Sequence, residues 1–306
     1  MIFKHTLSKY LHLSNTKFNE KSLLAVLRKK TGYTFTNCKK ALDLHNNDVN
    51  KAEVWLKEQA QQLGWSKATK LEGRQTSQGL VGVALNYSGK VAALVEVNCE
   101  TDFVARNKEF EKLVEEVAKT CLNYIKLDSV AHQSITKVNL DTERLKNLKS
   151  LDGKTLADKL ALTIGSVGEN ATLKRAECVK VNEDIYLSMY AHPSGKEING
   201  ALLGRVAGLV AFRSVGKNEK DFTEVGKNIC QHIVGMAPKR IGNVEEPSKE
   251  DEKDLVHQEY LLDDSLTVKD VLRENSIELI YFTRFECGEG ANVVGDQLLD
   301  FVETCQ

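Results

Sequence analysis

The stretch Val95-Glu96-Val97-Asn98-Cys99-Glu100-Thr101-Asp102-Phe103-Val104-Ala105-Arg106-Asn107 joins two different hydrophobic patterns. Its first residues end an apolar run that follows a Ser88-Gly89 turn and is rich in β-branched residues, which is typical of a strand. After the stretch, apolar residues recur at helical spacing, at Phe110, Leu113, Val114, Val117 and Ala118. The sequence therefore predicts a strand, a polar corner and a helix, in this order.

The polar corner places an aromatic residue directly after an acid, at Asp102-Phe103. A Phe at the junction of two elements is usually buried in the core. A compact ring held between a strand and a helix would also suit a rigid contact with a partner. Asp102 would either cap the helix or accept backbone donors. On residue types alone, both interpretations of each side chain stay open.

A similar order of elements recurs in the second half of the chain. We expect a strand over Ile185–His192, a second strand over Val206–Phe212, and a helix that Asp221-Phe222 opens. This second corner lacks the Val-Ala-Arg-Asn that follows Phe103, so we interpret its aromatic residue as structural. Residues 128–170, between the two copies, are expected to be a mostly helical connection. The pattern predicts an α+β fold with a duplicated hairpin-plus-helix core.

The N-terminal and C-terminal parts of the chain show shorter patterns. Residues 20–64 are expected to form three short helices, the third ending at Gly64, and residues 65–78 to form a polar linker. Near the C-terminus the pattern indicates a helix after Thr267 and a final strand over Leu279–Phe285. The predicted division is 1–19, a leader; 20–64, the helical bundle; 65–78, the linker; 79–180, the first core unit; and 181–306, the second.

Residues 1–19 differ in composition from the rest of the chain. They carry several Lys and His residues, and the first acid is Glu20. Phe3, Leu7 and Leu11 share one helical face, with Ser and Thr on the other side. This is the composition of a mitochondrial transit peptide, although such peptides usually contain Arg. A basic tail without a targeting role is the alternative.

The composition restricts the class of protein. The chain has 306 residues, 42% hydrophobic and 28% charged, with a net charge of −1, which is typical of a globular protein of about two domains. The balanced charge does not favour nucleic acid as a partner, and no apolar run reaches the roughly 20 residues of a membrane helix. The seven scattered cysteines contain no Cys-x-x-Cys pair, which argues for a reducing compartment and against a disulfide framework or a zinc site.

The sequence motifs of enzymes are weak. Gly153-Lys154-Thr155 could end a phosphate-binding loop, but Leu148 replaces the first glycine of that motif and Asp152 brings a negative charge. We interpret the string as a junction between a loop and a helix. The histidines are dispersed, and a lone one such as His192 or His232 is usually a hydrogen-bonded core or surface residue. We therefore expect no catalytic residues, no metal and no cofactor.

Three strings of this sequence together resemble the elongation factor Ts family, the nucleotide exchange factors of elongation factor Tu. They are the Val95–Asn107 stretch, Thr31-Gly32 followed by Cys38-Lys39-Lys40-Ala41-Leu42, and Arg284-Phe285-Glu286-Cys287-Gly288-Glu289-Gly290. The resemblance covers about residues 21–295. Many bacterial members insert a long helical hairpin before the last strand, and this chain lacks room for it, as do the shorter mitochondrial-type members.

The resemblance implies a function, a partner and a set of contact residues. The bundle is implied to be similar to a ubiquitin-associated domain and to dock on the GTPase domain of elongation factor Tu. Asp102 and Phe103 occupy the family positions that enter the region supporting Mg²⁺ in the GTPase. Tyr190-Ala191-His192 matches a family string that contacts a β-barrel domain of the partner. The implied partner-binding residues are Thr101, Asp102, Phe103, Val104, Ala105, Arg106 and Asn107 at the corner, Phe35, Thr36, Lys39 and Lys40 in the bundle, and His192 in the core.

We interpret the chain as a guanine nucleotide exchange factor of the mitochondrial matrix, without covalent chemistry of its own. Elongation factor Tu is its expected partner, with no direct contact to nucleic acid or to a membrane. The alternative is an adaptor that uses the bundle to recruit other proteins and does not promote exchange. An adaptor would have no need of the corner Thr101–Asn107.

Overall fold

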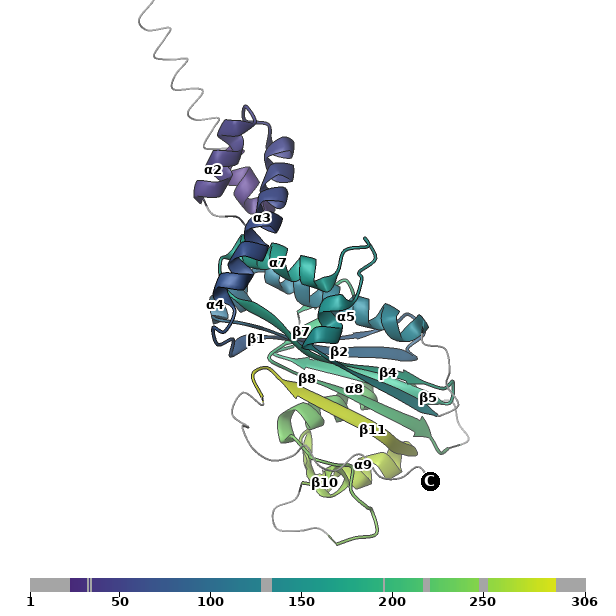
Figure 1. Ribbon diagram of the computed structural model, residues 1–306. Helices are drawn as coiled ribbons and strands as arrows, with labels where there is room; N and C mark the ends of the chain where they lie inside the picture. The colour runs from purple at the N-terminus through teal and green to yellow at the C-terminus, as the bar shows by residue number, and fades with distance from the viewer. Residues whose placement is uncertain are drawn as a thin grey trace, which may run out of the picture.

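A helical bundle and two β-sheets make up the computed structural model, which describes residues 23–31, 33, 35–127, 134–194, 196–216, 221–247 and 253–289 (Figure 1). The bundle lies at one end of the molecule, and helix α3 joins it to the sheets. The predicted leader, residues 1–19, lies outside the described residues, as does Cys305. The transit peptide therefore stays a prediction.

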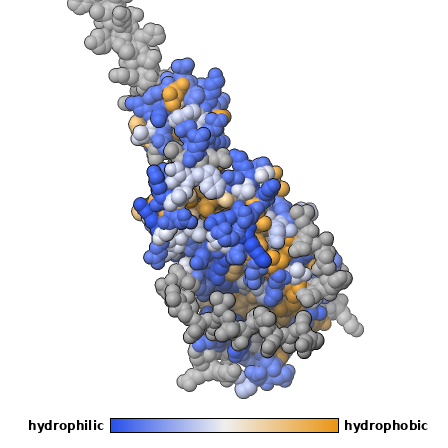
Figure 2. All heavy atoms as spheres, in the orientation of Figure 1, coloured by the Kyte–Doolittle hydropathy of each residue, from blue (hydrophilic) through white to orange (hydrophobic). Residues whose placement is uncertain are grey.

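The bundle consists of the helical residues 23–31, α2 (Phe35–Leu44) and α3 (Val49–Leu71). Asp48 caps α3, since its Oδ1 accepts the backbone N–H groups of Asn50 and Lys51 at 3.0 Å each. Small and aliphatic side chains form its core: Leu24, Leu27, Cys38, Ala41, Leu42, Ala52, Leu56 and Ala60. The prediction of three helices is confirmed. Figure 2 shows that the visible surface of the bundle is mostly hydrophilic, with small hydrophobic patches.

Helix α3 continues past Gly64, so the predicted end of the third helix is wrong. The helix ends at Leu71, and only residues 72–77 connect it to the first strand. Gly64 has a packing role instead of a capping role. A Cβ on this residue would lie 1.8 Å from the carbonyl oxygen of Ala161 in α7 (Leu156–Val167). A glycine is needed here because the two helix backbones touch.

The crossing of α3 and α7 is reciprocal. A Cβ on Gly165 of α7 would lie 2.1 Å from the carbonyl oxygen of Ala60 in α3. Ala60 and Gly64 are four residues apart, as are Ala161 and Gly165, and each glycine faces the alanine of the other helix. The two helices therefore pack at backbone contact and run in opposite directions at this point.

The larger sheet has six strands in the order β3-β4-β2-β1-β7-β6. All its pairings are antiparallel. Its strands are β1 (Gln78–Leu85), β2 (Val91–Cys99), β3 (Ile135–Asp141), β4 (Ala171–Val181), β6 (Glu197–Ile198) and β7 (Ala201–Gly204). Every residue of β2 is buried, because β2 lies inside the sheet and both faces of the sheet are covered.

The connection between residues 128 and 170 is not mostly helical, which corrects the prediction for its first part. It contains β3 before the helices α6 (Thr142–Asn147) and α7. Strand β3 is an edge strand with one buried residue, Leu140. An exposed edge strand has little apolar signal, so the periodicity did not reveal it.

The smaller sheet has three strands in the order β11-β8-β5, also antiparallel. They are β5 (Ile185–His192), β8 (Val206–Ser214) and β11 (Ile277–Glu286). Around them lie two helices, α8 (Thr223–Met236) and α9 (Val268–Asn275), and a 3₁₀ turn (Leu255–His257). The strands β9 (Glu259–Tyr260) and β10 (Asp263–Thr267) form a separate two-stranded sheet. The predicted helix after Thr267 and the final strand are confirmed.

The two sheets pack face to face, with helices on both outer faces. Side chains of both sheets meet between them, including Val81, Val83, Leu94, Ala191, Leu209 and Phe285. α5 (Lys108–Leu127) and α7 cover the outer face of the larger sheet, and α8 and α9 cover that of the smaller one. The α+β class is therefore confirmed.

The two halves of the core are connected differently. β1 and β2 are joined by a short turn over residues 86–90, whereas the chain leaves β5 to form β6 and β7 before it returns as β8. β7 pairs with β1 of the first half, for example Leu202 opposite Val83. This excursion links the halves into one body. The duplication of the core stays a prediction.

Candidate partner-binding surfaces

The corner Thr101–Asn107 forms one short helix between two caps. Thr101 caps α4 (Asp102–Ala105), since its Oγ1 accepts the backbone N–H of Val104 at 3.4 Å. Asn107 then accepts the backbone N–H of Glu109 with its Oδ1 at 2.8 Å, at the start of α5. The two side-chain caps, within seven residues, each start a helix, and the chain bends between α4 and α5.

The bend turns Phe103 towards solvent. Its side chain is 81% exposed, while the following Val104 and Ala105 are buried in the core of the larger sheet. Phe222, which follows Asp221 in the second Asp-Phe pair, is 6% exposed. It packs against Tyr186 and Phe212, with its ring centroid 5.1 and 5.9 Å from theirs. The burial expected of a Phe at an element junction therefore holds for Phe222 and fails for Phe103.

Asp102 does not cap the helix, because Thr101 has that position. Asp102 is the first helical residue, where its negative charge interacts favourably with the helix dipole. Its Oδ2 forms an ion pair with Arg106 at 2.9 Å. Both side chains are largely exposed, so this pair adds little stability and stays accessible.

A hollow of about 1040 Å³ lies beside the corner. One side of the hollow is formed by the corner and the residue before it: Glu100, Thr101, Asp102, Phe103, Ala105 and Arg106. The other side is formed by β1 and by the segment between β5 and β8: Gln78, Leu80, Pro193, Ser194, Lys196, Leu203, Gly204 and Arg205. The structure therefore brings the corner together with the chain that directly follows His192. His192 is exposed and does not line the hollow; its Nδ1 lies 3.4 Å from the hydroxyl of Tyr190.

Lys196 and Arg205 in this hollow were not expected from the sequence. Lys196 pairs with Glu111 of α5, and Arg205 donates to the side chain of Gln78 at 2.9 Å. No local pattern marks them, because the two sides of the hollow are far apart in sequence and meet through the pairing of β1 with β7.

A second hollow, of about 360 Å³, lies on the outer face of α2. It is lined by Phe35, Thr36, Lys39, Lys40, Asp43 and Leu44, which we call the bundle face. Phe35 is 54% exposed, although it is aromatic. The four bundle residues expected from the sequence all lie here. Asp43 and Leu44 were missed, although they follow Lys39 and Lys40 by one helical turn, the spacing that would have identified them.

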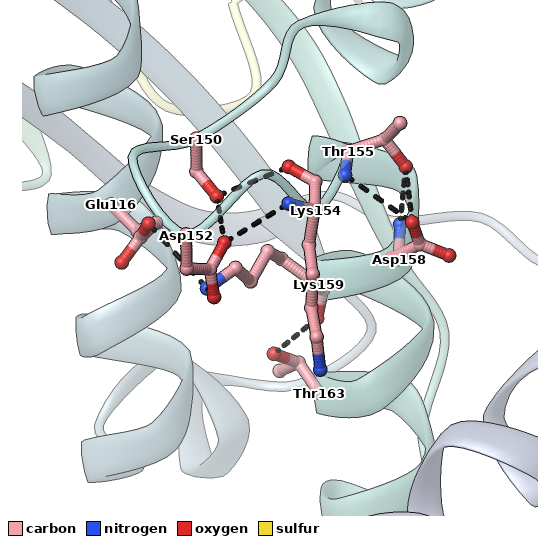
Figure 3. A network of polar contacts seen from close by, with 8 residues as sticks. All are labelled: Glu116, Ser150, Asp152, Lys154, Thr155, Asp158, Lys159 and Thr163. Carbon is pink, nitrogen blue, oxygen red and sulfur yellow. Dashed lines mark hydrogen bonds and ion pairs between the residues drawn. The ribbon is translucent and has the colours of Figure 1, made fainter.

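The string Gly153-Lys154-Thr155 begins a helix, as the sequence predicts (Figure 3). Thr155 caps α7 in a reciprocal box with Asp158. The carboxylate of Asp152 accepts the Ser150 hydroxyl at 2.6 Å and lies 2.5 Å from the Lys159 ammonium. Lys159 and then Ser150 hold the pKa of Asp152 well below its usual range. A carboxylate therefore occupies the turn where a phosphate would have to bind.

Among residues 23–289 that the structure describes, no group of three or more His, Cys, Asp or Glu side chains could hold a metal ion. Within the same part of the chain, no helix has the length and apolar character to cross a membrane. The cysteines there are free and buried: Cys38, Cys99, Cys121, Cys178, Cys230 and Cys287.

Known proteins match both the bundle and the core. The family "Elongation factor Ts, mitochondrial, N-terminal" matches residues 8–66, beginning inside the predicted leader, and the family "Elongation factor TS" matches residues 100–254. The mitochondrial elongation factor Ts of Aedes aegypti is 52% identical over 278 residues, covering 88% of this chain and 89% of that protein. Those of Drosophila melanogaster and Homo sapiens are 50% and 41% identical, covering 88% and 89% of this chain and 86% and 84% of theirs. With matches at this level across both parts, the chain belongs to the elongation factor Ts family and is a mitochondrial factor of translation elongation.

Proposed function

We propose that this chain is the guanine nucleotide exchange factor of mitochondrial elongation factor Tu. Membership of the family supports the partner and the reaction. The observation that carries the mechanism is the exposure of Phe103, 81% in a ring whose neighbours Val104 and Ala105 are buried. A large exposed ring on a capped corner is poorly explained by the stability of the chain alone.

Exchange of this kind needs no covalent chemistry. A GTPase holds GDP through backbone amides, a lysine and Mg²⁺. A factor that binds the nucleotide-free GTPase more tightly than the GDP-bound form must lower the affinity for GDP by the same ratio. In the proposed mechanism, Phe103 enters the region that supports Mg²⁺ and stabilises its displaced conformation. Asp102 and Arg106, exposed on the same turn, make polar contacts around the ring.

The bundle face provides a second proposed contact. Its exposed Phe35 lines the same hollow as Lys39 and Lys40 and so combines an apolar anchor with positive charge, a combination that suits a partially acidic docking surface on the GTPase domain. We further propose that the bundle is similar to a ubiquitin-associated domain, that the core is a duplicated unit, and that His192 makes a contact in the core. Neither nucleic acid nor a membrane is part of the proposed complex.

The second candidate function is an adaptor without exchange activity. The bundle face favours it, because this hollow would serve any protein partner equally well. The two functions differ in what they require of Phe103. An exchange factor needs this ring at the nucleotide site, whereas an adaptor that binds through the bundle does not.

Release of a fluorescent GDP analogue from mitochondrial elongation factor Tu distinguishes them. The full chain should accelerate release, and Phe103→Ala should slow the accelerated release strongly without lowering the melting temperature. Tyr87→Ala, which removes another fully exposed aromatic ring at the turn between β1 and β2, is the matched control and should act as the wild type. No acceleration by the wild type would refute exchange, and wild-type rates with Phe103→Ala would refute the wedge and favour the adaptor.

A separate experiment addresses the bundle face. Phe35→Ser should weaken binding to the nucleotide-free GTPase in calorimetry and leave the melting temperature unchanged, because this ring is 54% exposed in the free chain. Val54→Ser, which changes a side chain of α3 with 57% exposure outside the bundle face, is the control. Equal affinity of both variants would mean that the bundle binds something else.

A further inference from the structure

Helix α7 and the turn that follows it contact the two parts of the chain that carry the proposed binding surfaces, the bundle and the corner. Its middle lies against α3 at the paired contacts Gly64 to Ala161 and Ala60 to Gly165. Leu162 of α7 also packs against the core of the bundle. These contacts set the position of the bundle, because backbone contact between two helices leaves no side chain that could adjust.

A polar contact adds to this packing. Tyr33, in the turn between the first two helices of the bundle, interacts through its side chain with Ser166 in α7. Both residues are buried. Burial, as the main cause, raises the pKa of Tyr33 to about 12, so the hydroxyl stays protonated.

The C-terminal end of α7 reaches the corner. Gly168 ends the helix in a left-handed conformation, with φ of +82°. The next residue, Glu169, accepts the hydroxyl hydrogen of Thr101 at 2.8 Å. This is the same hydroxyl that accepts the N–H of Val104 and caps α4. Glu169 therefore fixes the orientation of the group that starts the helix carrying Phe103.

The residue after Glu169 supports the corner from its other side. The backbone N–H of Asn170 donates to the carboxylate of Glu100 at 2.7 Å. The side-chain amide of Asn170 donates to the carbonyl oxygen of Arg74 at 3.1 Å, and Arg74 in turn lies 3.5 Å from Glu100. Two consecutive residues of one turn thus hold the two residues that directly precede Asp102.

We infer that Glu169 is a positioning residue for exchange, and that α7 with the turn Gly168-Glu169-Asn170 holds the bundle face and Phe103 at a set distance and orientation. The inference rests on the proposed function. A corner that had to become ordered on binding would spend part of the binding free energy on that ordering. A corner that is held in advance can apply the energy of docking to the displacement of elements in the partner.

The test separates binding from exchange, using the full chain. Glu169→Ala leaves Thr101 able to cap α4 but removes the acceptor that orients its hydroxyl. We expect release of the fluorescent GDP analogue to slow about tenfold, which corresponds to about 1.4 kcal/mol, while affinity for the nucleotide-free GTPase changes less. Glu169→Gln keeps an acceptor oxygen and should restore most of the rate. A residue with only a structural role would lower the melting temperature and would not show this difference between rate and affinity.

A control variant in α6 and three outcomes decide whether Glu169 has the positioning role. Glu143→Ala removes an exposed glutamate of α6 that pairs with Lys146 at 2.8 Å, and should leave both rate and affinity at wild-type values. If wild-type chain accelerates release and Glu169→Ala does so equally, the positioning role is refuted and the proposed function stands. If the wild type itself does not accelerate release, the proposed function fails first. A rate loss in Glu169→Ala that Glu169→Gln does not restore would also refute the positioning role as stated.

Discussion

Arg175 of β4 lies over the ring of Phe285 in β11, with its guanidinium carbon 4.0 Å from the ring centroid. The same guanidinium donates to the fully buried carboxylate of Glu96 in β2, with Nε 2.7 Å from Oε2. The other oxygen of Glu96 accepts the backbone N–H of Gly288 at 2.8 Å. One buried acid therefore connects the C-terminal strand of the smaller sheet to two strands of the larger one, through the Arg-Phe-Glu-Cys-Gly-Glu-Gly string.

Glu96→Ala should destabilise this junction. It leaves Arg175 without its buried partner and the N–H of Gly288 without an acceptor, and the loss of one member of a buried pair typically costs about 3–5 kcal/mol. We expect the lower end, about 3 kcal/mol in the free energy of unfolding, because a third of the Arg175 side chain is exposed. Urea denaturation followed by circular dichroism measures it. Glu143→Ala is the surface control, and equal midpoints for the two variants would contradict the prediction.

Phe222→Ala should lower stability without directly removing a partner contact. The ring is buried among Tyr186, Phe212 and the side chains of α8, and truncation of a buried Phe typically costs about 3–5 kcal/mol. Phe103→Ala, at the other Asp-Phe pair, should change the free energy of unfolding by less than about 0.5 kcal/mol. Differential scanning calorimetry of both variants compares them directly. A similar loss of stability in the two would mean that Phe103 is packed in solution.

Two glycine substitutions in helices should differ in their effect on the free energy of unfolding. Gly165→Ala places a Cβ against the backbone of α3 and should destabilise by about 1–3 kcal/mol. Gly235→Ala, in α8, meets only the flexible end of Leu261 at 3.0 Å, so the better helix propensity of Ala should make it neutral or stabilising by up to about 1 kcal/mol. Thermal unfolding of both variants tests the pair. Destabilisation of equal size would show that the backbone contact between α3 and α7 is no tighter than the contact of Gly235 with Leu261.

Stability should fall as the pH falls below 6.5, because of His232. The Nδ1 atom of this buried residue accepts the backbone N–H of Leu261 at 3.1 Å, and Nε2 donates to the side chain of Gln258 at 3.0 Å. Both partners suit the neutral ring, and burial, the main cause, lowers the pKa of His232 from 6.5. The stacked neighbour Tyr260 does not ionise in this range, because burial raises its pKa.

The sign follows from proton uptake. As the pH falls through 6.5, the unfolded chain binds a proton at this histidine and the folded chain does not, so the contribution to stability is present above 6.5 and is lost towards the lower folded pKa. Melting temperatures between about pH 7 and pH 5 measure it. The advantage of the wild type over His232→Gln should shrink across this range. A constant difference would show that the ring does not titrate.

Local chemistry determined much of what the sequence predicted correctly. The β1–β2 hairpin, the junction of loop and helix at Thr155, the helix after Thr267 and the final strand depend on neighbours within a few residues. Periodicity and capping act over this range, so one sequence is sufficient to locate them. The structural role of Phe222 was also expected from adjacent residues, since its Asp-Phe pair lacks the Val-Ala-Arg-Asn that follows Phe103.

Contacts between distant segments decided the rest. Gly64 has the local signature of a helix end, yet α3 continues through it, and the close approach of Ala161 is the reason for the glycine. Strand β3 has little apolar signal of its own and exists because β4 offers it a full set of backbone partners. The hydrogen bond from Thr101 to Glu169 spans 68 residues, and the hollow beside Phe103 depends on the pairing of β1 with β7. The sequence alone determined which residues could form the corner, the caps and the strands. Only the tertiary structure decided how the bundle, α7 and the corner are held together, because packing and long-range hydrogen bonds depend on partners that no local pattern specifies.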